Sequence, residues 1–397
     1  MSKTKLILLL ILTIALIGAG AYSNFLQRRA KIPKIPAGKI EITAKTNAKN
    51  APRLSTLAAN LEVPWALVFL PASPTGGPDR IILFTERTGR VRLIDDKGYL
   101  KPDPIAVIDD VLAKGEGGLM GITIHPNFSK NHFVYVYYTY SANGNETLNR
   151  VARFKFEDNR LSDKTIIVDA IPGAFFHNGG RIKFGPASPA SPRGVQRGEP
   201  DGFLYITTGD SQNPSLAQNT NSLAGKILRV TDEGKPAPGN PYGTQIYSYG
   251  HRNPQGITWD KSGRLWETEH GASTMDELNI INTGKNYGWP TITGDGKQEG
   301  LETPILNSGS DTWAPAGAAF LNNSIYFGGL RGQALYEATI DGNKMTLKEH
   351  LKGELGRIRE VVVGADNLLY ITTSNRDGRG IPDTTDDKII RVNPNKL

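Results

Sequence analysis

The sequence repeats one pattern six times, at intervals of about 45–70 residues. Each repeat places a short apolar strand, a turn and a second strand rich in Tyr, Ile and Leu before a polar loop. The first strands are expected at 64–71, 119–126, 180–186, 254–260, 316–322 and 359–366, and their partners at 80–86, 133–140, 202–208, 264–270, 324–329 and 367–374. One such sheet cannot bury two apolar faces alone, but six stacked radially can.

Most repeats then end in a third strand, expected at 90–94, 151–156, 226–230, 277–281, 334–340 and 388–392. No stretch of the repeats keeps a 3.6-residue apolar period, which excludes a helical protein. The sequence therefore predicts an all-β fold, a six-bladed β-propeller with four-stranded antiparallel blades, over residues 53–397. Arg53–Asn60 is expected to add an outer strand to the C-terminal blade and so close the ring. A β-sandwich of the same strands is the alternative, and the sixfold recurrence favours the propeller.

The first 52 residues do not follow the repeat. Lys3 and Lys5 precede the apolar run 6–18, which leads into Ala19-Gly20-Ala21, an order typical of a secretory signal. Extended through residue 26, the same run would serve as an uncleaved anchor. We expect residues 1–26 to be a signal peptide or an N-terminal membrane anchor and 27–52 a basic linker. The propeller would then be exported, periplasmic or extracellular, and would meet a membrane only through this segment.

Charge and cysteine content exclude several classes of function. The formal net charge is +7, but nine Lys and Arg residues and a single acid, Glu41, lie in the first 50 residues. The repeats are therefore nearly neutral and lack the basic face of a nucleic-acid-binding domain. The chain has no cysteine, which excludes disulfides, thiolate metal sites and cysteine nucleophiles.

Chemically active side chains gather in the loops before the first strands and after the second strands, and in a propeller such loops converge at one mouth of the channel. Alone, each has an ordinary interpretation as a structural histidine, a solvated arginine or a turn. Together, a ring of guanidinium groups suits a ligand with several carboxylates or phosphates. A neutral imidazole among them is a natural general base. The arginines are Arg252, Arg331, Arg357 and Arg359, and the candidate imidazoles are those of His177, His251 and His270.

Several strings then become specific: GEGGLMGITIHPNF, HNGGRIKFGP, LYITTGD, YGHRNPQGI, TEHGASTMDELNII and NYGWP. They resemble the glucose/sorbosone dehydrogenase family, in particular its soluble aldose sugar dehydrogenases. Members of this family are six-bladed propellers that use pyrroloquinoline quinone (PQQ) and Ca²⁺. The resemblance runs from about Leu61 to Val392, in register with all six repeats.

The resemblance implies a role for each candidate residue. His177 would be the base that takes the proton from the C1 hydroxyl of an aldose, and Arg252 would stabilise charge on the quinone oxygen. The remaining cofactor contacts would come from Asn253, Thr312, Arg331, Arg357 and Arg359. Ca²⁺ would be held by the backbone carbonyls of Gly271 and Ala272, and the substrate side would be lined by Glu116, Asp276 and Trp313.

The chain departs from the family pattern at several positions. Phe176 stands where many relatives carry an acidic residue before the catalytic histidine, and Glu116 stands where some have Gln. Ala272 replaces a frequent Pro, and Arg331 replaces a Lys. The segment 310–315 lacks an aromatic residue that many relatives carry, and we expect Trp313 to compensate. These changes leave the redox residues in place and the sugar preference open.

The sequence thus predicts an exported oxidoreductase that oxidises the C1 hydroxyl of aldoses to the lactone by hydride transfer to PQQ, with an external electron acceptor. One alternative is a non-catalytic propeller that binds a carbohydrate or a protein, since fold alone does not establish function. Another is a metal-dependent, lactonase-like hydrolase. Such a hydrolase needs several inward carboxylates, and the expected rim is rich in arginine instead.

Overall fold

The computed structural model describes residues 50–71, 81–144, 146–186, 200–342 and 344–397. The expected signal or anchor segment and the linker up to residue 49 lie outside these ranges, so the interpretation of both stays a prediction. Among the described residues, no helix is long and apolar enough to cross a bilayer. The helices here are single turns: α2 (Phe128–Asn131), α3 (Ser215–Gln218), η1 (Pro241–Gly243) and η2 (Pro394–Lys396).

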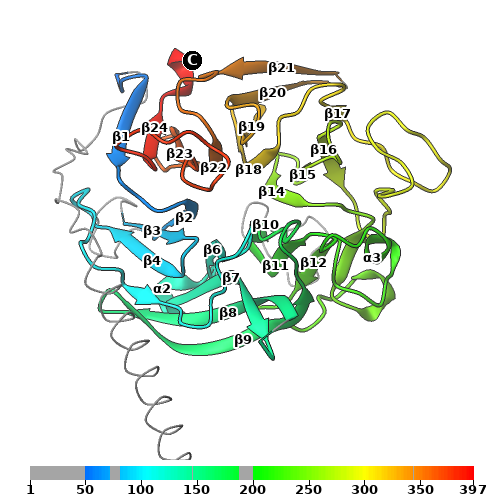
Figure 1. Cartoon of the computed structure of the whole chain (residues 1–397), viewed down its shortest axis with the longest axis horizontal. Coiled ribbons are helices and arrows are strands. Elements are labelled where there is room, and N and C mark those ends of the chain that lie inside the picture. The colour runs from blue at the N-terminus through cyan, green and yellow to red at the C-terminus, as the bar shows by residue number, and fades with distance from the viewer. Residues whose placement is uncertain (1–49, 72–80, 145, 187–199, 343) are drawn as a thin grey trace, which may run out of the picture. The chain divides into compact units, whose positions relative to one another are not determined.

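Six four-stranded antiparallel sheets form a ring, so the predicted propeller is confirmed (Figure 1). The first blade consists of β2 (Pro64–Phe69), β3 (Ile82–Glu86), β4 (Arg90–Ile94) and β5 (Ala106–Val107). The second consists of β6 (Leu119–Ile124), β7 (Phe133–Ala142), β8 (Glu146–Glu157) and β9 (Arg160–Pro172). The third consists of β10 (Ile182–Pro186), β11 (Pro200–Thr208), β12 (Lys226–Val230) and β13 (Ile246–Tyr249). The fourth consists of β14 (Pro254–Trp259), β15 (Leu265–Glu269), β16 (Glu277–Ile281) and β17 (Leu306–Asn307). The fifth consists of β18 (Pro315–Leu321), β19 (Ser324–Gly329), β20 (Leu335–Asp341) and β21 (Lys344–His350).

The two ends of the chain build the sixth blade together. Its strand order is β1 (Leu54–Ala58), β24 (Ile389–Val392), β23 (Leu369–Thr373) and β22 (Ile358–Val363). β1 pairs antiparallel with β24, and Figure 1 shows the blue strand beside the red one. The amide of Asn393 also donates to the carbonyl of Ala51 at 2.9 Å. The predicted ring closure by Arg53–Asn60 is therefore confirmed, and it leaves no open face between the first and last blades.

Buried aromatic and branched side chains fill the spaces between neighbouring blades. In β7, five consecutive residues from Val134 to Tyr138 are completely buried. A strand covered on both faces needs such a continuous apolar run rather than an alternating one. The strand pattern in the sequence therefore reflects sheets packed on both sides.

At the centre of the ring, the inner strands place six residues at equivalent positions: Ala66, Gly121, Arg181, Gly256, Gly317 and Glu360. Four are small because the strands crowd together there. A Cβ atom on Gly317, for example, would lie 2.1 Å from the carboxylate of Glu360. The remaining two form a fully buried ion pair, in which Arg181 donates to Glu360 and lies 4.3 Å above the ring of Trp65. This pair joins the third blade to the sixth.

We expect Glu360→Gln to lower the free energy of unfolding by about 3–5 kcal/mol, because the buried guanidinium of Arg181 would lose its counter-charge. Urea denaturation followed by tryptophan fluorescence measures this loss. Glu354→Gln is the matched control, because its partner Arg53 is 45% exposed and an exposed pair contributes about 0–1 kcal/mol. Equal losses in the two variants would show that the central pair does not stabilise the ring.

Candidate active site

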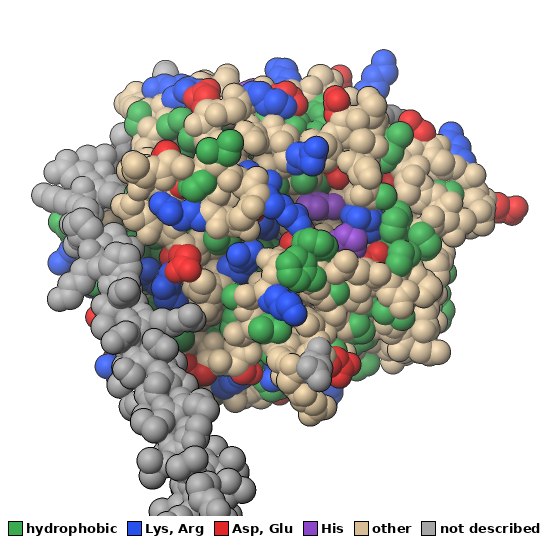
Figure 2. All heavy atoms as spheres, viewed as in Figure 1, with side chains coloured by type: hydrophobic (Ala, Val, Ile, Leu, Met, Phe, Trp, Pro, Cys, Tyr) green, Lys and Arg blue, Asp and Glu red, His purple; other side chains and the backbone are tan. Residues whose placement is uncertain are grey.

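A cavity of about 490 Å³ opens among the loops at one end of the ring. It has the size of a small-molecule site. In Figure 2, histidine side chains surrounded by Lys and Arg lie in the hollow near the middle of this face. Eight of the residues predicted from the sequence line the cavity: Glu116, His177, Arg252, Gly271, Ala272, Asp276, Thr312 and Arg331. Five further residues complete its wall: Phe176, His270, Ser273, Ala314 and Arg379.

His177 is fixed by its backbone and by a buried carboxylate. Its φ is +60°, and its carbonyl lies so close to Gly209 that a Cβ there would be 2.0 Å away. Its Nδ1 lies 2.7 Å from Oδ1 of Asp210, which is completely buried, and Oδ2 of Asp210 accepts from the indole of Trp289 at 2.8 Å. The carboxylate assigns the hydrogen to Nδ1, so Nε2 is left as the proton acceptor. Asp210 ends the string LYITTGD, but its spacing alone did not identify it as the partner of His177.

Arg252 contacts the loop that follows β15. Its Nη1 donates to the carbonyl of His270 at 3.2 Å, and its guanidinium carbon lies 5.3 Å from the ring centre of Trp289. Its backbone N–H donates to the carboxylate of Glu269. Burial lowers the pKa of Arg252, while the nearby carboxylates, Asp210 first among them, act against that shift. The guanidinium is thus a partly desolvated cation whose position is fixed at both ends.

Three buried donors or ring nitrogens have no hydrogen-bond partner among the described residues. They are Nε of Arg252 and Nε2 of His270, which belong to cavity residues, and Nδ2 of Asn253, which does not line the cavity. A buried polar group left unpaired costs about 1–3 kcal/mol. Asn253 is fully buried, and its Oδ1 accepts from the backbone of Gly179 at 3.1 Å. A planar ligand rich in carbonyl and carboxylate oxygens would satisfy such a set. The residues present therefore fit PQQ.

Arg357 and Arg359 do not line the cavity. Both are buried and share Oδ2 of Asp377, which accepts from Nη2 of Arg357 at 2.8 Å and from Nη2 of Arg359 at 3.3 Å. Burial lowers the pKa of Arg359 to about 10. Although burial alone would raise the pKa of Asp377, the charges of Arg359 and Arg357 lower it. The sequence analysis missed Asp377, and direct cofactor contacts by these arginines stay predictions.

Asp276 connects the two loops that carry the other candidate residues. Its Oδ1 accepts from the backbone of Gly271 at 2.9 Å. Its Oδ2 accepts from the hydroxyl of Thr312 and from the next two backbone N–H groups, at 2.6–3.1 Å. With four donors on one buried carboxylate, Asp276 positions the loops that present the carbonyls of Gly271 and Ala272. These hydrogen bonds explain the position of Asp276 without a substrate, and its expected contact with substrate stays a prediction.

The side chain of Trp313 does not lie on the wall of this cavity. It is 5% exposed and packs against Phe327 and Tyr336, with ring centres 5.6 Å apart in both pairs. It lines a neighbouring cavity of about 580 Å³ that shares Thr312 and Arg331 with the first. The indole therefore packs in the core, and its expected contact with substrate stays a prediction.

A buried acidic cluster lies behind the loop that follows β15. His251, Glu267 and Glu269 each present a ligand atom within 4.8 Å of the others, a set that could hold a metal ion. His251 is completely buried between Ser248 and Glu269 and stacks on Tyr287, so it is a structural residue rather than a cavity residue. Burial, with the charge of Glu269, raises the pKa of Glu267 well above its usual range and that of Glu277 to about 8.

The chain matches the glucose / sorbosone dehydrogenase family over residues 61–386. The chain belongs to this family. It is similar to the PQQ-bound aldose sugar dehydrogenase of Streptomyces coelicolor, at 36% identity and a TM-score of 0.75, over 85% of this chain and 96% of that one. It is also similar to the aldose sugar dehydrogenase YliI of Escherichia coli, at 29% identity over 82% of this chain and 91% of that one.

The chain is also similar to quinoprotein glucose dehydrogenase B of Acinetobacter calcoaceticus, at 29% identity over 63% of this chain and 55% of that protein. The predicted family is therefore confirmed. Because the family match covers all the cavity residues, the cavity belongs to the part of the chain that the family shares.

The raised pKa of Glu277 predicts how stability changes with pH. Its carboxyl is protonated in the folded chain up to about pH 8 but ionises near pH 4.5 when unfolded. The folded state thus binds more protons in this window, and stability falls as the pH rises through it. Between pH 5.5 and 8.5, ionisation of Glu277 should lower the free energy of unfolding of the wild type by up to about 3 kcal/mol, and Glu277→Gln should lack this decrease.

Urea denaturation at the two pH values, with a chelator present, measures this difference. Glu299→Gln, at an exposed glutamate of the following segment, is the control and should keep the wild-type pH dependence. Parallel pH profiles for wild type and Glu277→Gln would contradict the assignment.

Proposed function

We propose that this family member is an exported, PQQ- and Ca²⁺-dependent dehydrogenase that oxidises the C1 hydroxyl of aldoses to the lactone and passes the electrons to an external acceptor. One observation carries the proposal. The imidazole of His177, held by a buried carboxylate at 2.7 Å, shares a cavity with Arg252 and with ring and guanidinium nitrogens that have no partner of their own among the described residues. The names of the relatives support the same activity.

In this mechanism the side chains bind, orient and move one proton. Nε2 of His177 accepts the proton of the C1 hydroxyl, and Asp210 stabilises the imidazolium that forms. Arg252 stabilises negative charge on an oxygen placed beside its guanidinium, in a cavity where water is partly excluded. PQQ, when bound, supplies the quinone that takes up the C1 hydride.

The cofactor would be held mainly by donors. Arg252, Asn253 and Arg331 would contact its oxygens, and the carbonyls of Gly271 and Ala272 would ligate Ca²⁺, a hard cation that prefers oxygen. Arg357 and Arg359 would contribute from behind the wall, where Asp377 already neutralises part of their charge. A hydrolase would need free carboxylates, whereas Glu116 and Asp276 are both engaged by hydrogen-bond donors.

Reconstitution tests the proposal directly. Adding PQQ and Ca²⁺ to the purified protein should change its visible spectrum, raise its melting temperature by several degrees through ligand linkage and start dye reduction with aldoses. Omitting Ca²⁺ should weaken PQQ binding. An unchanged spectrum and melting temperature at saturating PQQ would contradict the proposal and favour a non-catalytic, carbohydrate- or protein-binding propeller.

Asp210→Asn should lower kcat by about 10²–10⁴-fold, because an amide no longer fixes the tautomer of His177 or stabilises its protonated form. Steady-state dye reduction measures the loss, and PQQ titration should show nearly unchanged cofactor binding. Asp169→Asn is the matched control, since Asp169 accepts a hydrogen bond from Tyr140 at 2.8 Å outside the cavity. Full activity in Asp210→Asn would exclude His177 as the base.

A further inference from the structure

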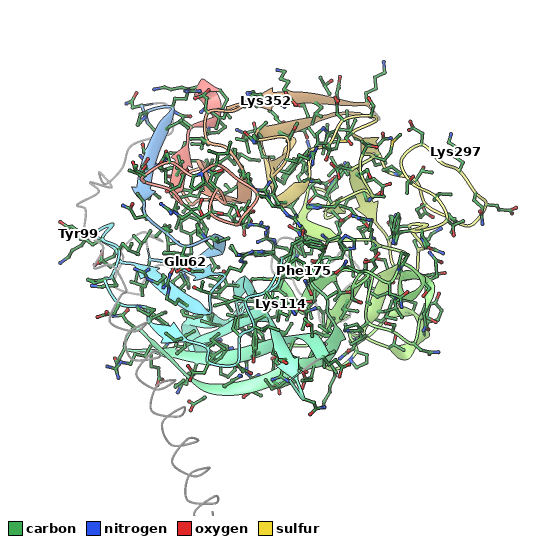
Figure 3. The ribbon with its side chains drawn as sticks, in the orientation of Figure 1. Glu62, Tyr99, Lys114, Phe175, Lys297 and Lys352 are labelled. Atoms are coloured by element: carbon green, nitrogen blue, oxygen red, sulfur yellow. The ribbon has the colours of Figure 1, made fainter. Side chains whose placement is uncertain are left out.

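An ion pair joins two distant loops at the mouth of the cavity. Nη1 of Arg379 lies 2.7 Å from Oε1 of Glu116, although 263 residues separate them in the chain. The guanidinium carbon of Arg379 also lies 4.8 Å from the ring centre of Phe176. All three residues line the cavity. Phe175, which packs edge-on against Phe176 at 4.6 Å, lies near the middle of the ring in Figure 3.

Both partners are held from behind. The backbone N–H of Arg379 donates to Oδ1 of Asp377 at 2.9 Å, and the other oxygen of Asp377 accepts from the two buried arginines beneath. Oε2 of Glu116 accepts from the backbone N–H of His177 at 3.1 Å. The carboxylate of Glu116 therefore links the guanidinium of Arg379 to the backbone of His177 through two hydrogen bonds.

The pair is electrically balanced and costly to separate. Although burial alone would raise the pKa of Glu116, the charges of His270 and Arg379 lower it, so Glu116 is ionised at neutral pH. Its side chain is 18% exposed, against 48% for Arg379. Drawing Arg379 away would leave the carboxylate of Glu116 without this counter-charge, with the backbone N–H of His177 still donating to it.

We propose that the Arg379–Glu116 pair sets the charge preference of the site, so that uncharged aldoses are accepted and aldoses with a carboxylate at C6, the uronic acids, are rejected. This inference rests on the proposed function. Because His177, Glu116 and Arg379 line one cavity, a pyranose whose C1 hydroxyl meets His177 also lies beside the pair, and the proposal places its C6 group there. A neutral hydroxymethyl group there can accept from Arg379 or donate to Glu116 without breaking the pair. A carboxylate there meets the charge of Glu116 and can bind Arg379 only by displacing it.

The test compares galactose with galacturonate, which share one ring and differ at C6. For the PQQ- and Ca²⁺-loaded protein, we expect kcat/KM to favour galactose by at least about tenfold. Glu116→Gln keeps an acceptor for the N–H of His177 but frees the charge of Arg379. The ratio should therefore move at least about tenfold toward galacturonate, through KM rather than kcat, and the gain should shrink in high salt.

Two further variants complete the design. Arg379→Gln should move the ratio away from galacturonate, since Glu116 then stands unopposed. Arg153→Gln is the matched control and should change nothing. Arg153 lies 2.7 Å from Glu233 and 4.2 Å from the ring centre of Phe133, but outside the cavity.

Ratios within twofold of wild type in both Glu116→Gln and Arg379→Gln would overturn the inference. Isothermal titration calorimetry of the two sugars with the protein separates this failure from that of the proposed function. If no aldose is oxidised, the proposed function fails, and the Kd ratio of galactose to galacturonate still decides the charge preference: a tenfold shift in Glu116→Gln supports it, and an unchanged ratio overturns it.

Discussion

The crowding of six inner strands around one axis is the constraint on which the rest of the structure depends. It demands small residues at four of the six central positions and leaves room for one buried ion pair, Arg181 with Glu360. The same crowding brings together the chain just before each inner strand. Several functional side chains lie three to five residues before the central residue of their own blade, as Glu116 lies before Gly121 and His177 before Arg181. Others, such as Asp276 and Arg331, follow the second strand of their blade. The geometry of the axis therefore assembles the site from five separate blades.

Buried carboxylates then fix what the axis brings together. Asp210 orients the imidazole of His177, Glu269 holds the backbone of Arg252, Asp377 holds two arginines, and Asp276 holds two loops. Each accepts from more than one donor, so each side chain behind the wall has little freedom. A site held this way does not need to reorganise when charge develops during a reaction, which is the condition for electrostatic stabilisation.

The sequence predicted the blades because strand, turn and strand recur within one repeat, and the family resemblance singled out His177 and Arg252 among the loops that converge. It did not predict Asp210, Asp377 or Arg379 as site residues, since each contacts a residue in a different loop: Asp210 and Asp377 contact residues of their own blades, and Arg379 contacts a residue of another blade. Arg379 meets Glu116 across 263 residues, in a polar loop whose composition resembles any turn. Trp313 shows the opposite difficulty. An aromatic residue at a loop end can face a ligand or fill the core, and Trp313 packs against Phe327 and Tyr336 while it also lines the cavity next to the one that holds His177.

An acidic cluster of Glu267, Glu269 and Glu277 lies behind the cavity and close to the positively charged arginines that line it. Three glutamates stand on one face of β15 and β16, with Glu269 opposite Glu277 across the strands, an arrangement that like charges disfavour. Burial reduces the conflict by raising the pKa of Glu267 well above its usual range and that of Glu277 to about 8. The carboxylate of Glu269 lies 2.9 Å from Nδ1 of His251 and accepts from the backbone N–H of Arg252. Arg252 still interacts with the nearby carboxylates, Asp210 first among them, which act against the lowering of its pKa by burial. The cation at the cavity is therefore held among acids rather than left without a counter-charge.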